Sequence, residues 1–129
     1  MASPTPGKTQ LGLEPNVAGL LCYMPLCCIG FVFSIVAIIV EKQNRFLKFH
    51  AFQSLLLGGA GLVVFGVVWV LSFVAGMVAA VLGLLVSLVM LLVGLALLAL
   101  CVFLMIKAYN NEEYALPVIG EMAKKWASQ

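Results

Sequence analysis

The stretch that decides the fold of this chain is residues 51–106, which read AFQSLLLGGAGLVVFGVVWVLSFVAGMVAAVLGLLVSLVMLLVGLALLALCVFLMI. It contains no Asp, Glu, Lys, Arg or Pro residue. As one α-helix it would be roughly 84 Å long, whereas the hydrocarbon core of a bilayer is about 30 Å thick. We therefore expect it to fold back on itself as two membrane-spanning helices over residues 51–75 and 81–106, with a turn between Ser72 and Gly83.

The composition of the whole chain also indicates a lipid environment. Of its 129 residues, 64% are hydrophobic and only 9% are charged. An ordinary soluble domain is about half apolar and about a quarter charged. A chain of this length could not cover so much apolar surface in water. The formal net charge of +2 comes from scattered basic residues, so no nucleic-acid partner is expected.

A further apolar segment, residues 17–40, precedes this stretch. Its 24 residues would form a helix of roughly 36 Å, long enough to cross the bilayer with some tilt. Pro25 lies inside it and should cause a kink or a short break near Tyr23, Met24 and Pro25, because proline removes a backbone hydrogen bond. The sequence therefore predicts an all-α integral membrane protein with three transmembrane helices.

The polar segments complete the predicted organisation. Residues 1–13 are expected to be a flexible tail, since their proline and small polar residues bury little. Residues 14–125 are expected to form a single membrane domain, and residues 126–129 the C-terminal end. Within that domain, residues 114–125 predict an amphipathic interfacial helix on the cytoplasmic leaflet, with a frayed polar tail as the alternative.

Residues 41–50, EKQNRFLKFH, hold the only concentrated charge between the predicted spans. They predict an amphipathic cytoplasmic loop in which Arg45 and Lys48 reach lipid phosphates. Three Lys and Arg residues lie in this loop and three at or beyond the end of the last span, whereas Lys8 lies alone in the amino tail. The positive-inside rule then predicts an amino end outside and a carboxyl end in the cytoplasm.

A contact surface for lipid or a partner is predicted where the second span begins. His50 is the only histidine, and it shares a helix face with Gln53. The two side chains could bind a headgroup, a partner or a proton, or they could simply bond the adjoining loop. No acidic residue or second histidine lies within a span, so neither a metal nor a cofactor is expected. The predicted contact residues are Arg45, Lys48, Phe49, His50, Gln53 and Trp126.

Small residues predict close packing of the membrane helices. Two ladders of Gly, Ala and Ser at four-residue intervals run through residues 72–87, and this spacing lets helices approach closely in lipid. The ladders cross the expected turn, so either the turn lies elsewhere or only half of each ladder is helical. The predicted packing residues are Gly58, Gly61, Gly76, Ala79 and Gly83.

The sequence shows no motif typical of catalysis. It has no serine nucleophile with a base, no phosphate-binding glycine loop and no metal cluster, so we expect a protein that is not an enzyme. The four cysteines lie in apolar stretches without zinc-site spacing. We interpret them as small apolar side chains and not as a disulfide framework.

The segment RFLKFHAFQSLLL at residues 45–57 resembles small bacterial membrane proteins of unknown function that are grouped with the Tic-twenty subunit of the chloroplast import apparatus. The likeness extends over residues 14–125, and its most specific part is carried by Phe49, His50, Ala51 and Gln53. Magnetosome membrane proteins of magnetotactic bacteria also look like members. The resemblance implies a bacterial cell-membrane protein, but membership alone does not fix a role.

Three functions remain open at this point. The first is a structural or accessory subunit of a larger membrane assembly, in contact with lipids and with a protein partner or further copies of itself. The second is a component of a transport or protein-translocation apparatus, and the third a lipid-sensing, membrane-organising protein. We favour the first, because a conducting path normally needs polar lining and residues 51–106 offer little beyond Gln53, serines and glycines.

Overall fold

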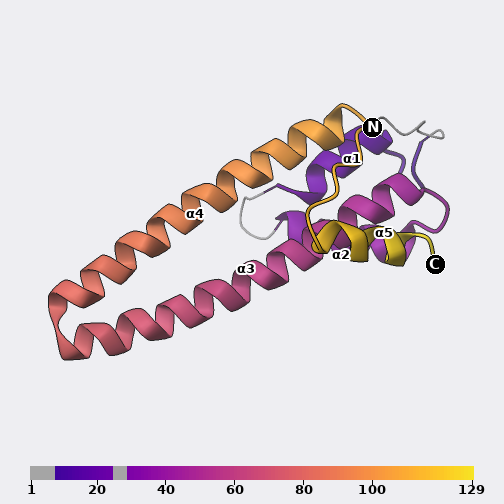
Figure 1. Ribbon diagram of the computed structural model, residues 1–129. Helices are drawn as coiled ribbons and strands as arrows, with labels where there is room; N and C mark the ends of the chain where they lie inside the picture. Colours follow the sequence, from indigo (N-terminus) through magenta and orange to yellow (C-terminus); the bar gives the residue numbers. More distant parts are fainter. Residues whose placement is uncertain (1–7, 25–28) are drawn as a thin grey trace. The chain divides into compact units, whose positions relative to one another are not determined.

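The computed structural model describes residues 8–24 and 29–129, and this part of the chain is helical, with no β-strand. The helices are α1 (Pro15–Cys22), α2 (Ile29–Val40), α3 (Arg45–Val78), α4 (Ala80–Tyr109) and α5 (Ile119–Ala127) (Figure 1). They divide into two compact units. The hairpin unit is residues 59–100, and the bundle unit comprises the described residues up to Gly58 together with residues 101–129.

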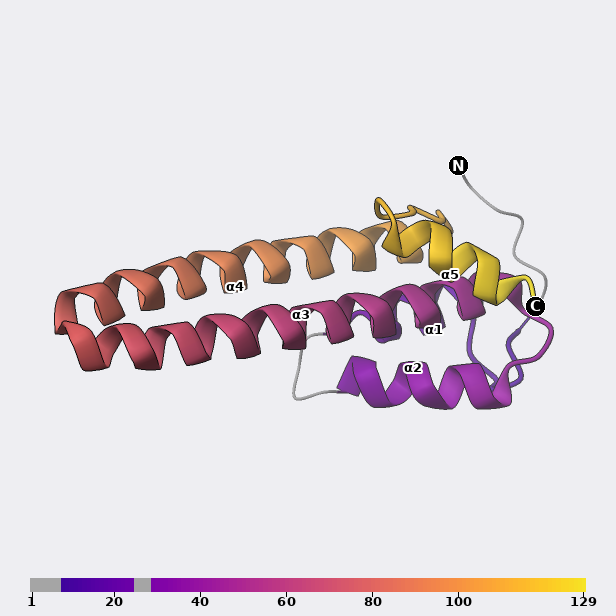
Figure 2. The ribbon, with the colours of Figure 1, turned by 60° about the horizontal axis from the view of Figure 1, so that its bottom comes forward.

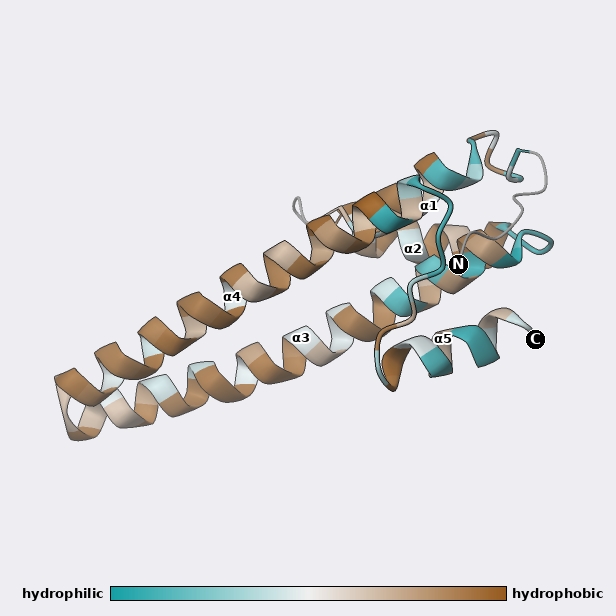
Figure 3. Cartoon of the chain, turned by 45° about the horizontal axis from the view of Figure 1, so that its top comes forward, coloured by the Kyte–Doolittle hydropathy of each residue, from teal (hydrophilic) through white to brown (hydrophobic). Residues whose placement is uncertain are grey.

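The hairpin unit confirms the predicted return of the chain within the long apolar stretch. The turn lies at Ala79, inside the expected range, between α3 and α4. Backbone bonds continue through it, because the Ala79 N–H donates to the Ala75 carbonyl at 2.9 Å and the Gly83 N–H to the Ala79 carbonyl at 3.2 Å. Apolar residues predominate on both helices (Figure 3). At 34 and 30 residues, α3 and α4 are each long and apolar enough to cross a membrane.

Small residues bring the two helices of the hairpin together. A Cβ atom added to Gly83 would lie only 2.9 Å from the Gly76 Cα atom, so the two backbones meet there without side chains between them. The small-residue ladders thus meet across the turn, face to face. Farther from the turn, a Cβ atom on Gly61 would lie 3.9 Å from the Leu97 side chain. This glycine leaves room for a large side chain of the opposite helix.

The prediction that residues 17–40 cross the membrane as one span, interrupted at most by a kink or a short break, is wrong. Two shorter helices, α1 and α2, replace it, and they run antiparallel. The Gln10 N–H, just before α1, donates to the Glu41 carboxylate just after α2 at 2.7 Å. At the other end of α1, the Cys22 carbonyl accepts from the Ser34 hydroxyl of α2 at 3.3 Å. Helix α1 ends at Cys22, where the prediction placed a kink or a short break, and Pro25 itself lies outside the described residues.

A buried carboxylate secures the return of the chain after α2. Glu41 is only 1% exposed, and besides the Gln10 N–H it accepts the N–H groups of Gln43 and Asn44 at 3.2 and 3.0 Å. Asn44 in turn caps α3, since its side-chain oxygen accepts the Leu47 N–H at 3.1 Å. An asparagine in this position satisfies a backbone donor that the first turn of a helix leaves free. The loop is therefore an ordered helix start and not a loose surface segment.

Part of the expected flexible tail is also folded. Thr9 is buried, and both its N–H and its hydroxyl donate to the Leu13 carbonyl, at 2.9 and 3.0 Å. The Gly12 N–H closes the turn by donating to the Thr9 carbonyl at 2.9 Å. Gly12 has a φ of +78°, a conformation that glycine adopts at little cost. The earlier residues of that tail, 1–7, lie outside the described part of the chain.

The C-terminal segment forms the predicted helix, α5, and not a frayed tail. Its buried residues Ala123 and Ala127 pack on Phe49 of α3, with Phe52, Leu56 and Ala115 around them. Figure 2 shows α2 and α5 on different sides of the first turns of α3. Its location on the cytoplasmic leaflet stays a prediction.

Candidate contact site

A buried network of polar side chains lies at the centre of the bundle unit. His50 and Gln53 stand one turn apart on α3, and Tyr23 follows α1. The Tyr23 hydroxyl lies 3.0 Å from His50 Nδ1 and accepts a hydrogen bond from Gln53 Nε2, also at 3.0 Å. Because that oxygen already accepts from Gln53, its own proton is available to His50 Nδ1. The network ties the end of α1 to α3.

Gln53 also holds the backbone that leads into α5. Its Nε2 donates to the Tyr114 carbonyl at 2.9 Å, and its Oε1 accepts the Leu116 N–H at 3.0 Å. The amide nitrogen and the amide oxygen of Gln53 therefore bind two residues of the same segment, Tyr114 and Leu116. A neighbouring β-strand would satisfy the same backbone groups in this way. This clamp brings the tail next to α3 and explains why α5 docks there.

His50 lies among aromatic rings. The rings of Phe46, Phe49 and Tyr23 meet it edge to face, with centroid distances of 4.5, 5.0 and 5.5 Å. Its Nε2 atom is buried and has no hydrogen-bond partner among the described residues. Gly19 of α1 completes the enclosure, because a Cβ atom there would lie 3.4 Å from His50 Cδ2.

Of the two roles predicted for His50 and Gln53, the structure favours bonds within the chain, and it corrects the prediction that they and Phe49 form an outer contact surface. The three are 0, 0 and 1% exposed, so none of them can meet a headgroup or a partner. The physical reason is that α1 and the segment before α5 cover the face of α3 on which they lie. Their polar groups bond the chain's own backbone and side chains, so they hold the bundle unit together.

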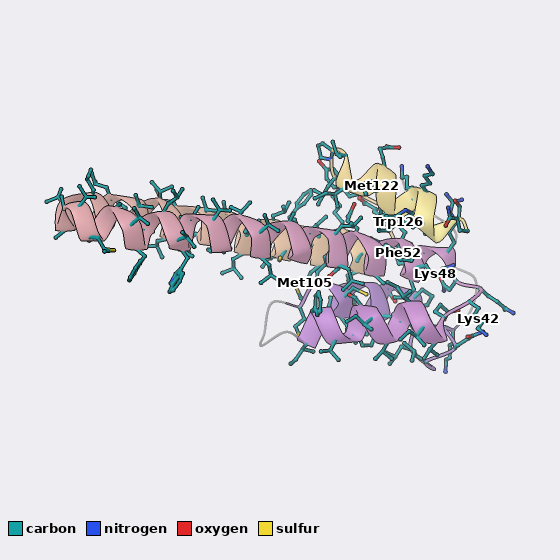
Figure 4. The ribbon with its side chains drawn as sticks, turned by 90° about the horizontal axis from the view of Figure 1, so that it is seen from below. Lys42, Lys48, Phe52, Met105, Met122 and Trp126 are labelled. Atoms are coloured by element: carbon teal, nitrogen blue, oxygen red, sulfur yellow. The ribbon has the colours of Figure 1, made fainter. Side chains whose placement is uncertain are left out.

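The other predicted contact residues remain at the surface. Arg45 is exposed in the first turn of α3, and Lys48 is half-buried. The Lys48 ammonium donates to the backbone oxygen of Gln129 at 3.1 Å. Trp126 is 38% exposed and meets the Phe52 ring edge to face at 5.7 Å. Figure 4 shows Lys48, Phe52 and Trp126 where α3 and α5 meet.

Several residues that bind the bundle unit together were missed in the sequence. The Cys22 carbonyl accepts from Ser54 as well as from Ser34, so one free carbonyl at the end of α1 joins three helices. Glu41 and Tyr23 were not among the predicted contact or packing residues. The sequence signal that could have identified them is a hydroxyl or carboxylate beside an apolar segment. If such a group is buried, it needs a hydrogen-bond partner within the fold.

The described residues offer no cluster for a metal. No group of three or more His, Cys, Asp or Glu side chains among them could hold an ion. Cys22 and Cys101 are free thiols.

Of the predicted packing residues, Gly58 lies in the bundle unit. It accommodates the Phe31 ring of α2, since an added Cβ atom would lie 3.6 Å from that ring.

One ion pair closes the loop after α4. Lys107 and Glu112 approach to 2.8 Å, with both side chains about one third exposed. Donation from the Lys107 ammonium holds the pKa of the Glu112 carboxyl below its usual value. The pair is exposed to solvent, so its contribution to stability is small.

These features define an all-helical membrane protein with two long apolar helices and a helical bundle that buries a polar hydrogen-bond network. The chain belongs to the magnetosome magnetite crystal formation protein family, whose sequence profile matches residues 14–123. It is also similar to proteins described only as UPF0132 membrane proteins. One from Methanocaldococcus jannaschii is 40% identical over 121 residues, covering 94% of this chain and 96% of the relative.

Two further relatives have the same description. A second protein of Methanocaldococcus jannaschii is 32% identical over 120 residues, covering 90% of this chain and 72% of its own length. A protein of Archaeoglobus fulgidus is 33% identical over 113 residues, covering 88% of this chain and 95% of its own length. No solved structure matches the chain. These relatives are archaeal, whereas the resemblance implied a bacterial cell membrane, and the likeness to Tic-twenty stays a prediction.

Proposed function

We propose that this protein acts without catalysis, as a structural or accessory subunit of a larger membrane assembly. The observation that carries the proposal is the surface of the two long helices. None of the most apolar part of α3 and only 6% of that of α4 is buried within the chain. Lipid or the helices of other subunits must therefore cover large side chains such as Leu62 and Val63, which are 70 and 67% exposed.

One face of the hairpin unit suits the close approach of a membrane helix from another subunit. Gly59 and Gly66 lie seven residues apart on α3, so they share a face, and a Cβ atom on either would meet nothing within 4 Å. Leu62 and Val63 lie between them. Helices associate in lipid through small residues that allow close backbone approach, with larger side chains packing beside them. We expect a transmembrane helix of a partner subunit on this face.

The topology that we propose has two spans and both ends on one side. Gln10 bonds Glu41, and the Asn16 amide donates to the Tyr109 carbonyl at 3.2 Å, so the start of α1, the end of α2 and the end of α4 lie close together. If α3 and α4 each cross once, all seven Lys and Arg residues fall on the same side as these segments. The positive-inside rule then favours the cytoplasm for that side.

Cysteine labelling tests this topology in intact cells. Lys8→Cys and Lys124→Cys should react with a membrane-impermeant maleimide only after permeabilisation, whereas Ala79→Cys should react from outside. The unsubstituted chain serves as the background for its four native cysteines. Reaction of position 8 from outside would restore the three-span topology and refute the one proposed here.

Co-purification tests the accessory role. A tagged chain extracted in mild detergent should retain a partner in fixed stoichiometry, and Gly59→Leu with Gly66→Leu should release it. Ala96→Leu adds the same side chain to an exposed site on α4 and should leave the complex intact. Recovery of the chain as a monomer from native membranes would contradict the proposal, and a ring of identical chains would favour the transport alternative.

A further inference from the structure

The short helix α5 presents three different faces. Its inner face, Gly120, Ala123 and Ala127, is buried. Met122 and Trp126 lie four residues apart along one flank, where they are 39 and 38% exposed. The opposite side has only polar residues, and these are Glu121, Lys124, Lys125 and Ser128. A helix that met only water on its outer side would be polar there, and a helix buried in a protein would be apolar all round. An outer surface that is half apolar and half charged is typical of a helix at a membrane interface.

The apolar flank continues onto α3. The Trp126 ring contacts the Phe52 ring edge to face, and Phe52 is half-buried beside it. Figure 4 shows Phe52, Met122 and Trp126 close together, with Lys48 near the end of α5. Packing of Ala123 and Ala127 on Phe49 prevents the helix from rolling, so the apolar flank keeps its direction. Phe52, Met122 and Trp126 are called the aromatic flank below.

We propose that the aromatic flank and the lysines of α5 form a docking surface for anionic phospholipid in the leaflet beside the bundle unit. Tryptophan is enriched at membrane interfaces, where its ring lies among acyl chains and its N–H reaches the headgroups. Lys124 and Lys125 outnumber Glu121 on the other side of the helix, and their ammonium groups match lipid phosphate in charge.

A bilayer lies within reach of this surface. Only residues 110–118 separate α5 from α4, a candidate membrane span, and nine residues extend at most about 30 Å. The surface shares no residue with the glycine face of the hairpin, Gly59 and Gly66, on which the accessory role depends. The two proposals can therefore fail independently.

The full chain with Trp69→Phe provides the test, because Trp126 is then its single tryptophan. The purified protein in neutral detergent is titrated with short-chain phosphatidylglycerol or phosphatidylcholine, and Trp126 emission is followed. Phosphatidylglycerol should shift the emission at a lower concentration than phosphatidylcholine. Lys124→Gln with Lys125→Gln should weaken the effect of phosphatidylglycerol by about 5-fold per lysine, which corresponds to about 1 kcal/mol each.

Lys8→Gln with Lys42→Gln is the matched control, since it removes the same charge outside α5. It should change the phosphatidylglycerol midpoint by less than about twofold, because neither lysine belongs to the proposed surface and exposed charges are screened by salt. Equal effects of the two lipids on the Trp69→Phe chain would overturn the proposal, and so would equal losses in both double variants. An equal emission shift with inorganic phosphate would show a soluble-anion site and would also overturn it.

Discussion

Replacing Gln53 by leucine removes the clamp that holds the C-terminal segment. The amide makes three hydrogen bonds, to Tyr23, Tyr114 and Leu116, and it is 0% exposed. Leucine has a similar volume but cannot bond, so the Leu116 N–H and the Tyr114 carbonyl would remain buried without a partner. Each such group costs about 1–3 kcal/mol, so for the two groups we expect the docked tail to lose about 2–6 kcal/mol.

Limited proteolysis of the full chain in mild detergent measures this loss. Trypsin can cut after Lys124 or Lys125 only when α5 opens, because cleavage requires an extended backbone. A loss of about 2–6 kcal/mol raises the open population by roughly 30-fold to more than ten-thousand-fold, and the cleavage rate should rise with it.

Ser54→Ala is the matched control for the Gln53 variant. Ser54 lies next to Gln53 on α3 but donates to the Cys22 carbonyl and not to the tail. Its loss should weaken the contact with α1 and leave tail cleavage near the rate of the unmodified chain. An unchanged cleavage rate in Gln53→Leu would refute the clamp, and an equal rise in both variants would show general loosening of the bundle unit.

Two further substitutions test the packing of each unit. Glu41→Gln should lower the stability of the bundle unit by about 1–3 kcal/mol, because both carboxylate oxygens accept N–H groups and the amide replaces one of them with an NH2 group that cannot accept. An unchanged Tm in detergent would contradict this. Gly83→Leu should destabilise the hairpin by about 1–3 kcal/mol through overpacking at the turn, whereas Gly66→Leu, with nothing within 4 Å, should not. Equal Tm values for the two leucine variants would count against close contact at Gly83.

The hairpin unit was largely predictable from the sequence. Residues 51–106 without a charge or a proline must satisfy their backbone polar groups within helices, and a stretch longer than the bilayer is thick must turn. These two arguments gave the helices α3 and α4 and a turn within the range that contains Ala79. The glycines at the turn were predicted to pack, but their pairing depended on where the chain turned.

The bundle unit could not be predicted in the same way. Residues 17–40 are long enough and apolar enough for a span, so hydropathy alone reads them as one helix. The hydrogen bonds from Gln10 to Glu41 and from Ser34 to Cys22 connect residues far apart in the sequence, and no local pattern contains them. They decide that α1 and α2 run antiparallel.

The sequence by itself determined that this protein lies in lipid. The free energy of transferring a segment from water into a bilayer depends on its apolar composition and its length, and both can be read from the sequence. Only the tertiary structure decided what the polar side chains do. His50 and Gln53 mark the start of an apolar helix in the sequence, where they could face lipid, a partner or the chain itself. The fold places Tyr23 and the backbone of residues 114–116 against them. The physical reason is that a buried amide without hydrogen-bond partners loses its contacts with water and gains nothing in return.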